Sequence, residues 1–491
     1  MTIEPNRIPT LFSHILIITI LVGGLVQGTT MNVSAQTSGM VVVINSDTTW
    51  TKANSPYDLT GPLFISAGAT LTIEAGVSVN LNNYDVLVNG TLRALGSSSD
   101  KIYVISNDET IEFSEYSNGW DEQTQSGCII DNAILESVNL RIGVSIKIVN
   151  SYVSCPIDVG ESSIIQNSTI STLSILGGSV LVKNNKIDLI KKCYGTPEIS
   201  NNTIDELGSD AYGTSPVISG NTIRTIGGYK VEGSTVSIKY LTLNSPIIKN
   251  NIIKEGIYLV TGSSTIIANN TITGYLLKYT YSVYTYPLGS TEQRDATFRT
   301  SGIDLVGKGS KVKDKIYISG NVISGCSTGI RAGNPGYPIK GEGVQIENNF
   351  ISNSSYSGID VTAQAIIQNN SIRNNPTAII VRKSSSATIN YNNIENYADY
   401  SIFLEETSTS VDATNNWWGT TDTQTINTTI RDFKHDFNLG KVSFSPFLTE
   451  PNPEKMLIPE LPSWMILPLF LVTTLAVVSF RKRIMCRGYT R

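Results

Sequence analysis

Five segments of the chain share a pattern in which a small residue precedes Ile, and the residue after that Ile is reactive in several of them. This position holds Tyr258, Asp304, Arg331, Asp360 and Ile380. If the segments are stacked strands, successive side chains point to opposite faces, so the Ile points inward and the next residue points outward. The pattern therefore predicts an outer column that reads acid, base, acid at its centre.

Such a column could act on an acidic sugar. Asp304 and Asp360 could hold Ca²⁺ against a uronate while Arg331 abstracts a proton or neutralises the carboxylate, as in a lyase. Two carboxylates two coils apart, about 9–10 Å, would also suit an inverting glycoside hydrolase. The alternative is a surface ladder of salt bridges, which is common and contributes little stability. We expect the ladder.

A second candidate is an insertion near 273–300 that is rich in tyrosine. Its Tyr279, Tyr281, Tyr284 and Tyr286, together with Tyr258, have the apolar face and polar tip that suit contact with sugars. The alternation of the tyrosines also fits a hairpin that only packs on the body of the protein. A long loop on a regular scaffold is a common place for function.

These residues lie within a repeat. The form Ile-x-x-Asn-x-Ile recurs with short spacings of 17 to 22 residues, for example from Ile247 to Ile253 and from Ile366 to Ile372. That period is too short for two-helix repeats, and the Leu framework of leucine-rich repeats is absent. Inward Ile would stack between coils. Asn tolerates a left-handed turn, and its amides could form a ladder along the axis.

The chain from about 61 to 448 resembles the right-handed parallel β-helix family, in its pectate-lyase-like branch with the carbohydrate-binding and sugar-hydrolase repeat. The opening 68–77 is similar to the first coils of such surface proteins, and 415–420 with 446–448 is similar to their closing element. The resemblance implies an all-β fold, a single-stranded right-handed solenoid. It gives no activity, and the catalytic motif of pectate lyases has no clear match.

The ends indicate export and anchoring. Residues 1–35 form a predicted signal peptide, with an apolar run and small residues before a cut. A predicted transmembrane helix, 464–480, precedes a basic tail, 481–491, which places the C-terminus inside and the body outside the cell. The segment Pro459–Pro462 resembles the sorting signal that archaeosortase-type enzymes recognise on archaeal surface proteins, so we expect such an enzyme as a partner.

Between these ends we predict a lead-in at 36–60, the β-helix at 61–448 and a Pro-rich stalk at 449–463. The C-terminal cap is placed at 411–448, where Trp417 and Trp418 are expected to cover the last coil. Open ends of a solenoid expose strand edges and need such covering.

Composition excludes several classes of protein. The ends hold six of the 36 basic residues and one of the 41 acidic residues, so residues 36–463 carry a net charge of −10. That balance argues against nucleic acid as a partner. Only His14 and His435 are present, so no multi-histidine metal site exists, and Ca²⁺ is the one cofactor that the residues suggest. Cysteine spacing indicates neither a metal site nor a disulfide pairing.

Seven sequons in the expected extracellular region are candidates for glycosylation: Asn89, Asn167, Asn201, Asn269, Asn353, Asn369 and Asn427. The sequence thus predicts a single-pass, cell-surface β-helix protein that binds a polysaccharide or envelope glycan, mediates adhesion, or has a structural role in the envelope. The alternative is a polysaccharide lyase or glycoside hydrolase that uses the outer column. A periplasmic-type maturation factor fits less well, because the chain has no Met- or His-rich metal tract.

Overall fold

A computed structural model describes most of the chain between the two predicted end segments. All the described residues except Gly39 belong to one compact unit that begins at Met40. The predicted signal peptide, transmembrane helix and basic tail lie outside the described residues, in which no helix is long and apolar enough to cross a membrane. The described ranges are 39–210, 215–232, 235–261, 264–285, 290–309, 311–312, 314–383 and 385–453.

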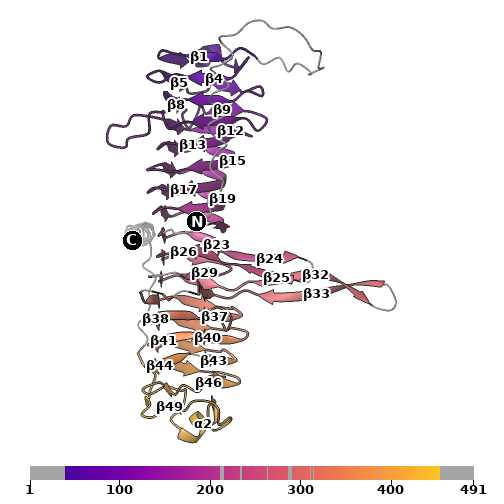
Figure 1. Ribbon diagram of the computed structural model, residues 1–491, viewed down its shortest axis with the longest axis vertical. Coiled ribbons are helices and arrows are strands. Elements are labelled where there is room, and N and C mark those ends of the chain that lie inside the picture. Colours follow the sequence, from indigo (N-terminus) through magenta and orange to yellow (C-terminus); the bar gives the residue numbers. More distant parts are fainter. Residues whose placement is uncertain are drawn as a thin grey trace, which may run out of the picture. The chain divides into compact units, whose positions relative to one another are not determined.

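The unit from Met40 onward is a stack of coils (Figure 1). Each coil contributes one strand to a smaller sheet, turns sharply, and then contributes to a larger sheet, and strands pair in parallel with the coils before and after. The strands of the smaller sheet are β2 (Thr48–Trp50), β5 (Thr70–Glu74), β8 (Thr91–Leu95), β11 (Ile129–Asp131), β14 (Lys147–Val149), β16 (Ile164–Gln166), β18 (Leu181–Lys183), β20 (Glu198–Ser200), β22 (Val217–Ser219), β27 (Ile247–Lys249), β30 (Ile266–Ala268), β35 (Ile316–Ser319), β38 (Ile339–Glu347), β41 (Ala363–Gln368), β44 (Ser386–Asn390), β47 (Val411–Asp412) and β49 (Val442–Ser443).

The larger sheet has 28 strands among the described residues. They are β1 (Val42–Ile44), β3 (Tyr57–Asp58), β4 (Leu63–Ile65), β6 (Ser78–Asn80), β7 (Val86–Val88), β9 (Ile102–Ile105), β10 (Thr110–Phe113), β12 (Ala133–Glu136), β13 (Asn139–Ile142), β15 (Tyr152–Val159), β17 (Thr169–Leu176), β19 (Lys186–Tyr194), β21 (Thr203–Asp210), β23 (Thr222–Ile226), β26 (Leu241–Leu243), β28 (Ile252–Ile253), β29 (Ile257–Thr261), β31 (Thr271–Thr273), β34 (Ile303–Gly307), β36 (Val322–Ser324), β37 (Thr328–Ala332), β39 (Phe350–Ser352), β40 (Ser357–Val361), β42 (Ser371–Arg373), β43 (Thr377–Arg382), β45 (Asn393–Glu395), β46 (Tyr400–Glu405) and β48 (Ile430–Arg431).

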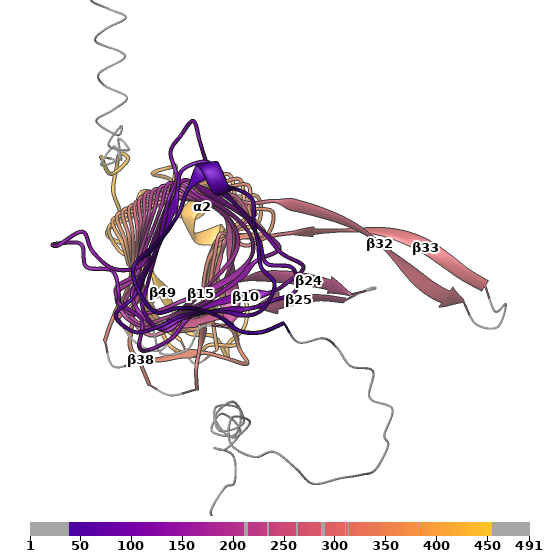
Figure 2. The same ribbon diagram turned by 90° about the horizontal axis from the view of Figure 1, so that it is seen from above.

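Two antiparallel hairpins leave this stack and extend away from the coils (Figure 2). The first is β24 (Gly228–Glu232) with β25 (Thr235–Lys239), and the second is β32 (Leu276–Thr285) with β33 (Ser290–Arg299). The second occupies the predicted insertion. The described helices are short: the 3₁₀ turn η2 (Lys52–Asn54) and α2 (Thr423–Thr428).

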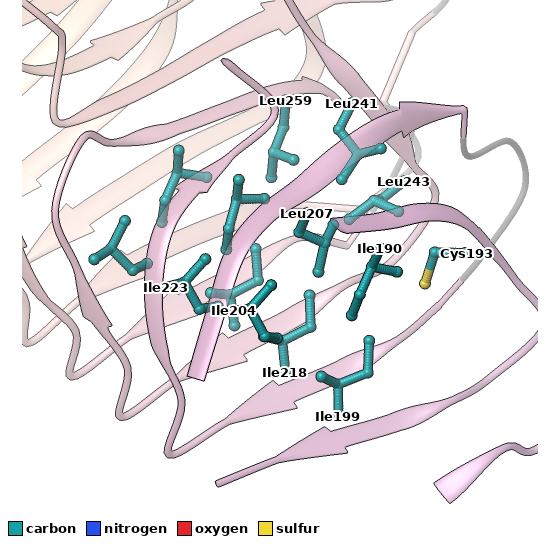
Figure 3. Close-up of a cluster of buried hydrophobic side chains, with 14 of the residues drawn as sticks. Ile190, Cys193, Ile199, Ile204, Leu207, Ile218, Ile223, Leu241, Leu243 and Leu259 are labelled. Carbon is teal, nitrogen blue, oxygen red and sulfur yellow. The ribbon is translucent and has the colours of Figure 1, made fainter. Parts of the chain in front are cut away.

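The core confirms that the repeated Ile residues point inward. Ile199 and Ile218 of the smaller sheet face Ile204 and Ile223 of the larger sheet, and all four are at most 1% exposed (Figure 3). Because both sheets turn the same branched side chains toward one axis, each coil buries its apolar residues against the coils on either side.

The second Asn of each repeat forms the predicted ladder. The Asn185 Nδ2 donates to Asn202 Oδ1 at 3.0 Å, and the Asn202 Nδ2 donates to Asn221 Oδ1 at 3.0 Å. The same bond then continues from coil to coil through residues 251, 270, 321, 349, 370, 392 and 416. An amide can do this because it both donates and accepts, so identical buried residues satisfy one another.

The two ends of the stack differ from the predicted boundaries. The first coil begins at Val42, inside the expected lead-in, because β1 pairs with β4. At the other end Trp418 is 1% exposed and packs edge-on against Phe444, while Trp417 Nε1 donates to Glu395 Oε1 at 2.6 Å. Trp418 thus lies in the core near the C-terminal end of the stack, while Trp417 lies half-buried on the outer side against Glu395.

The predicted stalk does not leave the coils at 449. The backbone N–H of Asn452 donates to Asn393 Oδ1 at 2.7 Å, and Asn393 Nδ2 donates back to the Asn452 carbonyl at 2.9 Å. The Asn452 side chain also donates to Asn369 Oδ1 at 3.2 Å. The chain therefore runs back along the coils at least to Asn452, because the turn residues there offer free amide groups.

Candidate functional site

The register of the larger sheet aligns the outer column in the predicted order. Tyr258 pairs with Asp304, Asp304 with Arg331, and Arg331 with Asp360. The column then continues through Ile380, Phe403 and Arg431. These residues alternate with core residues such as Ile303 and Leu305, so their side chains lie on the outer face.

The expectation that this column is an exposed surface ladder is wrong. Tyr258 and Asp304 are 0% exposed and Asp360 is 2% exposed, and among the predicted catalytic residues only Arg331 reaches solvent, with a side chain 25% exposed. The covering comes from residues outside the strand pattern. Tyr240, which follows the first hairpin, packs its ring edge-on against Tyr258. A strand pattern specifies which face a residue occupies but not what folds over that face.

Tyr258 is consequently not available as a sugar platform. Its hydroxyl donates to the Glu255 carbonyl at 3.3 Å and accepts from the Ser301 backbone N–H at 3.1 Å. Those bonds tie the start of β29 to the end of the second hairpin. Burial raises the pKa of Tyr258, so the hydroxyl stays protonated and its role is structural.

The predicted acid–base–acid set separates into two ion pairs. Arg331 Nη1 donates to Asp304 Oδ2 at 3.1 Å. Asp360 pairs instead with Arg382, whose Nε and Nη2 donate to its two carboxylate oxygens at 2.7 and 2.9 Å. Arg382 also bonds Glu405 and the Tyr356 hydroxyl. Arg382 lies two residues after Ile380, on the same face of its strand, and that spacing could have revealed it.

Asp304 is the most unusual group on this face. Its Oδ1 is buried and has no hydrogen-bond partner in the part of the chain that the structure describes. Burial raises the pKa of Asp304 above its ordinary value, and the positive charge of Arg331 offsets only part of this effect. Burial therefore disfavours the charged form of Asp304 more than its neighbours stabilise it.

A further charged cluster lies at the base of the first hairpin. Arg224 bonds Glu255 at 2.7 Å, Asp205 at 2.8 Å and Glu206 at 3.3 Å, and the Tyr229 hydroxyl donates to Glu255 at 3.0 Å. The Tyr229 ring contacts Phe298 of the second hairpin at 5.9 Å. The cluster therefore joins the two hairpins to the sheet, and the repeat pattern gave no signal for it.

The tyrosine-rich insertion forms the long hairpin β32–β33. Tyr279 is half-buried and lies opposite Ala296, while Tyr281 and Tyr284 belong to the same strand. Tyr286 lies outside the described residues. The insertion is therefore a hairpin, as the alternation suggested, but it projects away from the coils instead of packing along them (Figure 2).

A pocket that the sequence did not predict lies at the C-terminal end of the outer column. Its volume is about 570 Å³. Aromatic rings from three places form much of its wall: Tyr400 contacts Phe403 at 5.2 Å and His435 at 6.5 Å, and Tyr356 comes from the turn before β40. The remaining lining residues are Thr377, Ile380, Ala398, Asp399 and Thr428.

Charged groups hold this wall in place. Arg431 lies over the Phe403 ring at 4.5 Å, and Arg382 Nη2 donates to the Tyr356 hydroxyl at 3.2 Å. Phe403 and Tyr356 are thus each held by an arginine of the larger sheet, and ordering of this kind reduces the entropy lost on binding. Two of the lining residues, Ile380 and Phe403, belong to the outer column, but the pocket also depends on Asp399 and His435 from loops and on Thr428 at the end of α2.

The described residues contain no group of three His, Cys, Asp or Glu side chains close enough to hold a metal ion. The four described cysteines are free thiols, and three of them, Cys128, Cys193 and Cys326, are buried. Burial raises the pKa of Cys128 to about 11, so its thiol is not reactive at neutral pH. Cys128, Cys193 and Cys326 thus behave as small core residues, as expected, whereas Cys155 is only partly buried.

Comparison with known proteins supports the fold. The family model described as a right handed beta helix region matches residues 301–430. This range contains Asp304, Arg331, Asp360 and most of the pocket. No curated protein and no solved structure matches the chain. Together with the parallel register of both sheets, the match over this part of the chain fits a right-handed β-helix, a fold that does not specify an activity.

Proposed function

We propose that this protein is an exported, membrane-anchored β-helix that binds a glycan at the pocket beside Tyr400. The observation that supports this proposal is that aromatic rings and polar side chains line one pocket of about 570 Å³. That volume lies within the usual range for ligand sites. Export and anchoring rest on the two apolar end segments of the sequence.

The chemistry of the wall favours a sugar over a purely apolar ligand. The faces of Tyr400 and Tyr356 can pack against the C–H face of a pyranose ring. Asp399 and His435, both exposed, and Thr377 can exchange hydrogen bonds with its hydroxyl groups. The site would thus recognise a ring that is apolar on one side and rich in hydroxyls at its edge.

The test measures binding of polysaccharides to the purified full-length protein, with neutral and acidic glycans compared. Tyr400→Ala should weaken binding at least about tenfold, which corresponds to about 1.4 kcal/mol. The matched control is Tyr337→Ala, which removes a tyrosine that is 62% exposed and lies outside the pocket. The control should change affinity less than about twofold. Equal losses in both variants, or no binding by the wild type, would refute the proposal and leave a structural role.

Shortening the long hairpin separates the pocket from the predicted tyrosine platform. A variant in which residues 279–296 are replaced by a two-residue turn should keep its glycan affinity if the pocket binds the ligand. Loss of affinity with an intact pocket would instead assign binding to the hairpin.

The second candidate is a polysaccharide lyase or hydrolase, and the unpartnered Oδ1 of Asp304 favours it. Its elevated pKa would suit an acid, but Arg331 is held by Asp304 and both carboxylates are buried. Incubation with acidic polysaccharides, with and without Ca²⁺, should leave the ultraviolet absorbance of unsaturated uronates unchanged. A rise in absorbance that Arg331→Ala abolishes would establish the lyase instead.

A further inference from the structure

The turn after each strand of the smaller sheet presents its first residue to solvent. At Asn167, Asn201 and Asn269 the backbone is left-handed, with φ of 52°, 56° and 55°, and each side chain is exposed. The next residue in each turn points inward, where Asn202 and Asn270 belong to the buried ladder. The residue after that is a threonine on the outer side. The turn thus places the Asn amide and the Thr hydroxyl of each sequon on the same side of the chain.

Asn353 has the same arrangement on the second turn of its coil. Its φ is 56° and its side chain is exposed, Ser354 is buried, and Ser355 is exposed again. In four of the seven sequons, therefore, the Asn and the third residue lie on the outer side of the turn, and the residue between them is buried.

In the other three sequons the Asn side-chain oxygen accepts a hydrogen bond from a side chain outside the turn. Asn89 Oδ1 accepts from Ser114 Oγ at 2.7 Å, and Asn427 Oδ1 accepts from Lys434 Nζ. Both asparagines are half-buried. Asn369 is exposed, but the Asn452 side chain bonds its Oδ1 and the returning chain lies over it. A bulky group at any of these sites would displace a contact of the native structure.

Two of the four exposed sequons also make long side-chain hydrogen bonds. Asn167 Nδ2 donates to Asn150 Oδ1 at 3.4 Å and Asn167 Oδ1 accepts from Asn184 Nδ2 at 3.3 Å, while Asn353 Nδ2 donates to Ser352 Oγ at 3.4 Å. The three sequons that follow strands of the smaller sheet are separated from one another along the stack. Asn167 and Asn201 are two coils apart, and Asn201 and Asn269 are three coils apart, which corresponds to about 10 and about 14 Å. The coil after Asn201 has Gly220 at the equivalent position, where a Cβ atom would lie 2.5 Å from Asn201 Oδ1. Because Gly220 has no side chain, the Asn201 side chain is not crowded by the coil that follows it.

We propose that Asn167, Asn201, Asn269 and Asn353 carry N-linked glycans, three of them in a file along one edge of the stack. In the transfer, the amide Nδ2 forms a bond to the anomeric carbon of a glycosyl diphosphate donor. The diphosphate leaves with the bonding electrons, and Nδ2 loses one proton. The proposal depends on export of the chain, but not on the pocket beside Tyr400.

The test is mass spectrometry of peptides from the full-length protein, purified from its own cells. We expect glycan occupancy at these four sites to be at least about fivefold higher than at Asn89, Asn369 and Asn427. Thr203→Val should remove one glycan mass, because it deletes the hydroxyl of the Asn201 sequon and keeps a β-branched residue. Asn184→Gln is the control, since Asn184 has the same turn position but is followed two residues later by Lys186; its glycan mass should not change.

Two results would overturn the proposal. Unmodified asparagine at all four sites would exclude glycosylation there. Equal occupancy at all seven sites would show that the sequon alone, and not the exposure of the turn, selects the site. Neither result depends on whether the protein binds a polysaccharide, so failure of this proposal and failure of the binding function are distinguishable.

Discussion

The buried Asn ladder and the outer column of the larger sheet both run along the stack of coils. The ladder repeats one residue type, whereas the column contains residues of opposite charge. Ladder residues such as Asn321 are identical from coil to coil and fully buried. In the column, Asp304 is followed by Arg331 and then Asp360, and each ion pair is local. An amide can satisfy a copy of itself, whereas a carboxylate needs an unlike partner. Identical residues can therefore stabilise every coil in the same way, whereas the residues of the outer column differ from coil to coil and can form a site at one place only.

Breaking the ladder should have the largest effect. Asn321→Ala removes three donated bonds, to Ile267, Ser319 and Asn349, and the acceptor that Asn270 uses. Because the orphaned groups stay buried, we expect the free energy of unfolding to fall by about 3 to 5 kcal/mol. Denaturant unfolding of the purified protein measures it.

The control for the ladder is an exposed Asn of the same turns. Asn250→Gly keeps the left-handed backbone, and Gly220 and Gly320 already occupy equivalent positions in other coils. Its effect should stay within about 0.5 kcal/mol. A comparable loss in both variants would mean that turn geometry, and not the buried amide, stabilises the coils.

Breaking an ion pair of the outer column should lower the free energy of unfolding by less than breaking the ladder does. Asp360→Asn removes a charge that Arg382 contacts through two nitrogens, but Arg382 keeps Glu405 and a partly exposed position. We expect a loss of about 2 to 3 kcal/mol, below the usual cost of orphaning a fully buried charge. A double-mutant cycle with Arg382→Gln measures the coupling.

The neighbouring pair Lys383–Glu406 gives the matched comparison. Its side chains are 70% and 74% exposed, so Glu406→Gln should change stability by less than about 0.5 kcal/mol. If the two pairs proved equal, burial of the column would have no energetic consequence.

The effect of replacing Asp304 should depend on pH. Since burial raises the pKa of Asp304 in the folded state, the native protein holds that proton more tightly than the unfolded chain does. The protonated Asp304 side chain therefore stabilises the folded state fully at pH values below the pKa of Asp304 in the unfolded chain. This contribution is lost as the pH rises through the pKa of Asp304 in the folded protein. Asp304→Asn should therefore gain stability relative to wild type between acidic and neutral pH. Thermal unfolding across that range tests it, and a constant difference would contradict it.

The repeat made the fold predictable, while the site was only partly predictable. Ile223 and Asn202 could be placed because period-two alternation and a recurring spacing assign each to a face. The same alternation aligned Asp304 with Arg331. It gave no information on Tyr240 or His435, because these come from segments that follow no period, and it did not give the partners of Arg224, which lies in β23.

The sequence by itself determined the repeated parallel coils, the inward Ile, the amide ladder and the order of the outer column. Each of these follows from a local rule that is repeated in every coil. Only the tertiary structure decided that Asp360 pairs with Arg382, that Tyr240 covers the column, and that Tyr356, Tyr400 and His435 enclose one pocket. Those contacts join segments many residues apart, and their partners depend on how insertions fold across the sheet, which no short-range pattern encodes.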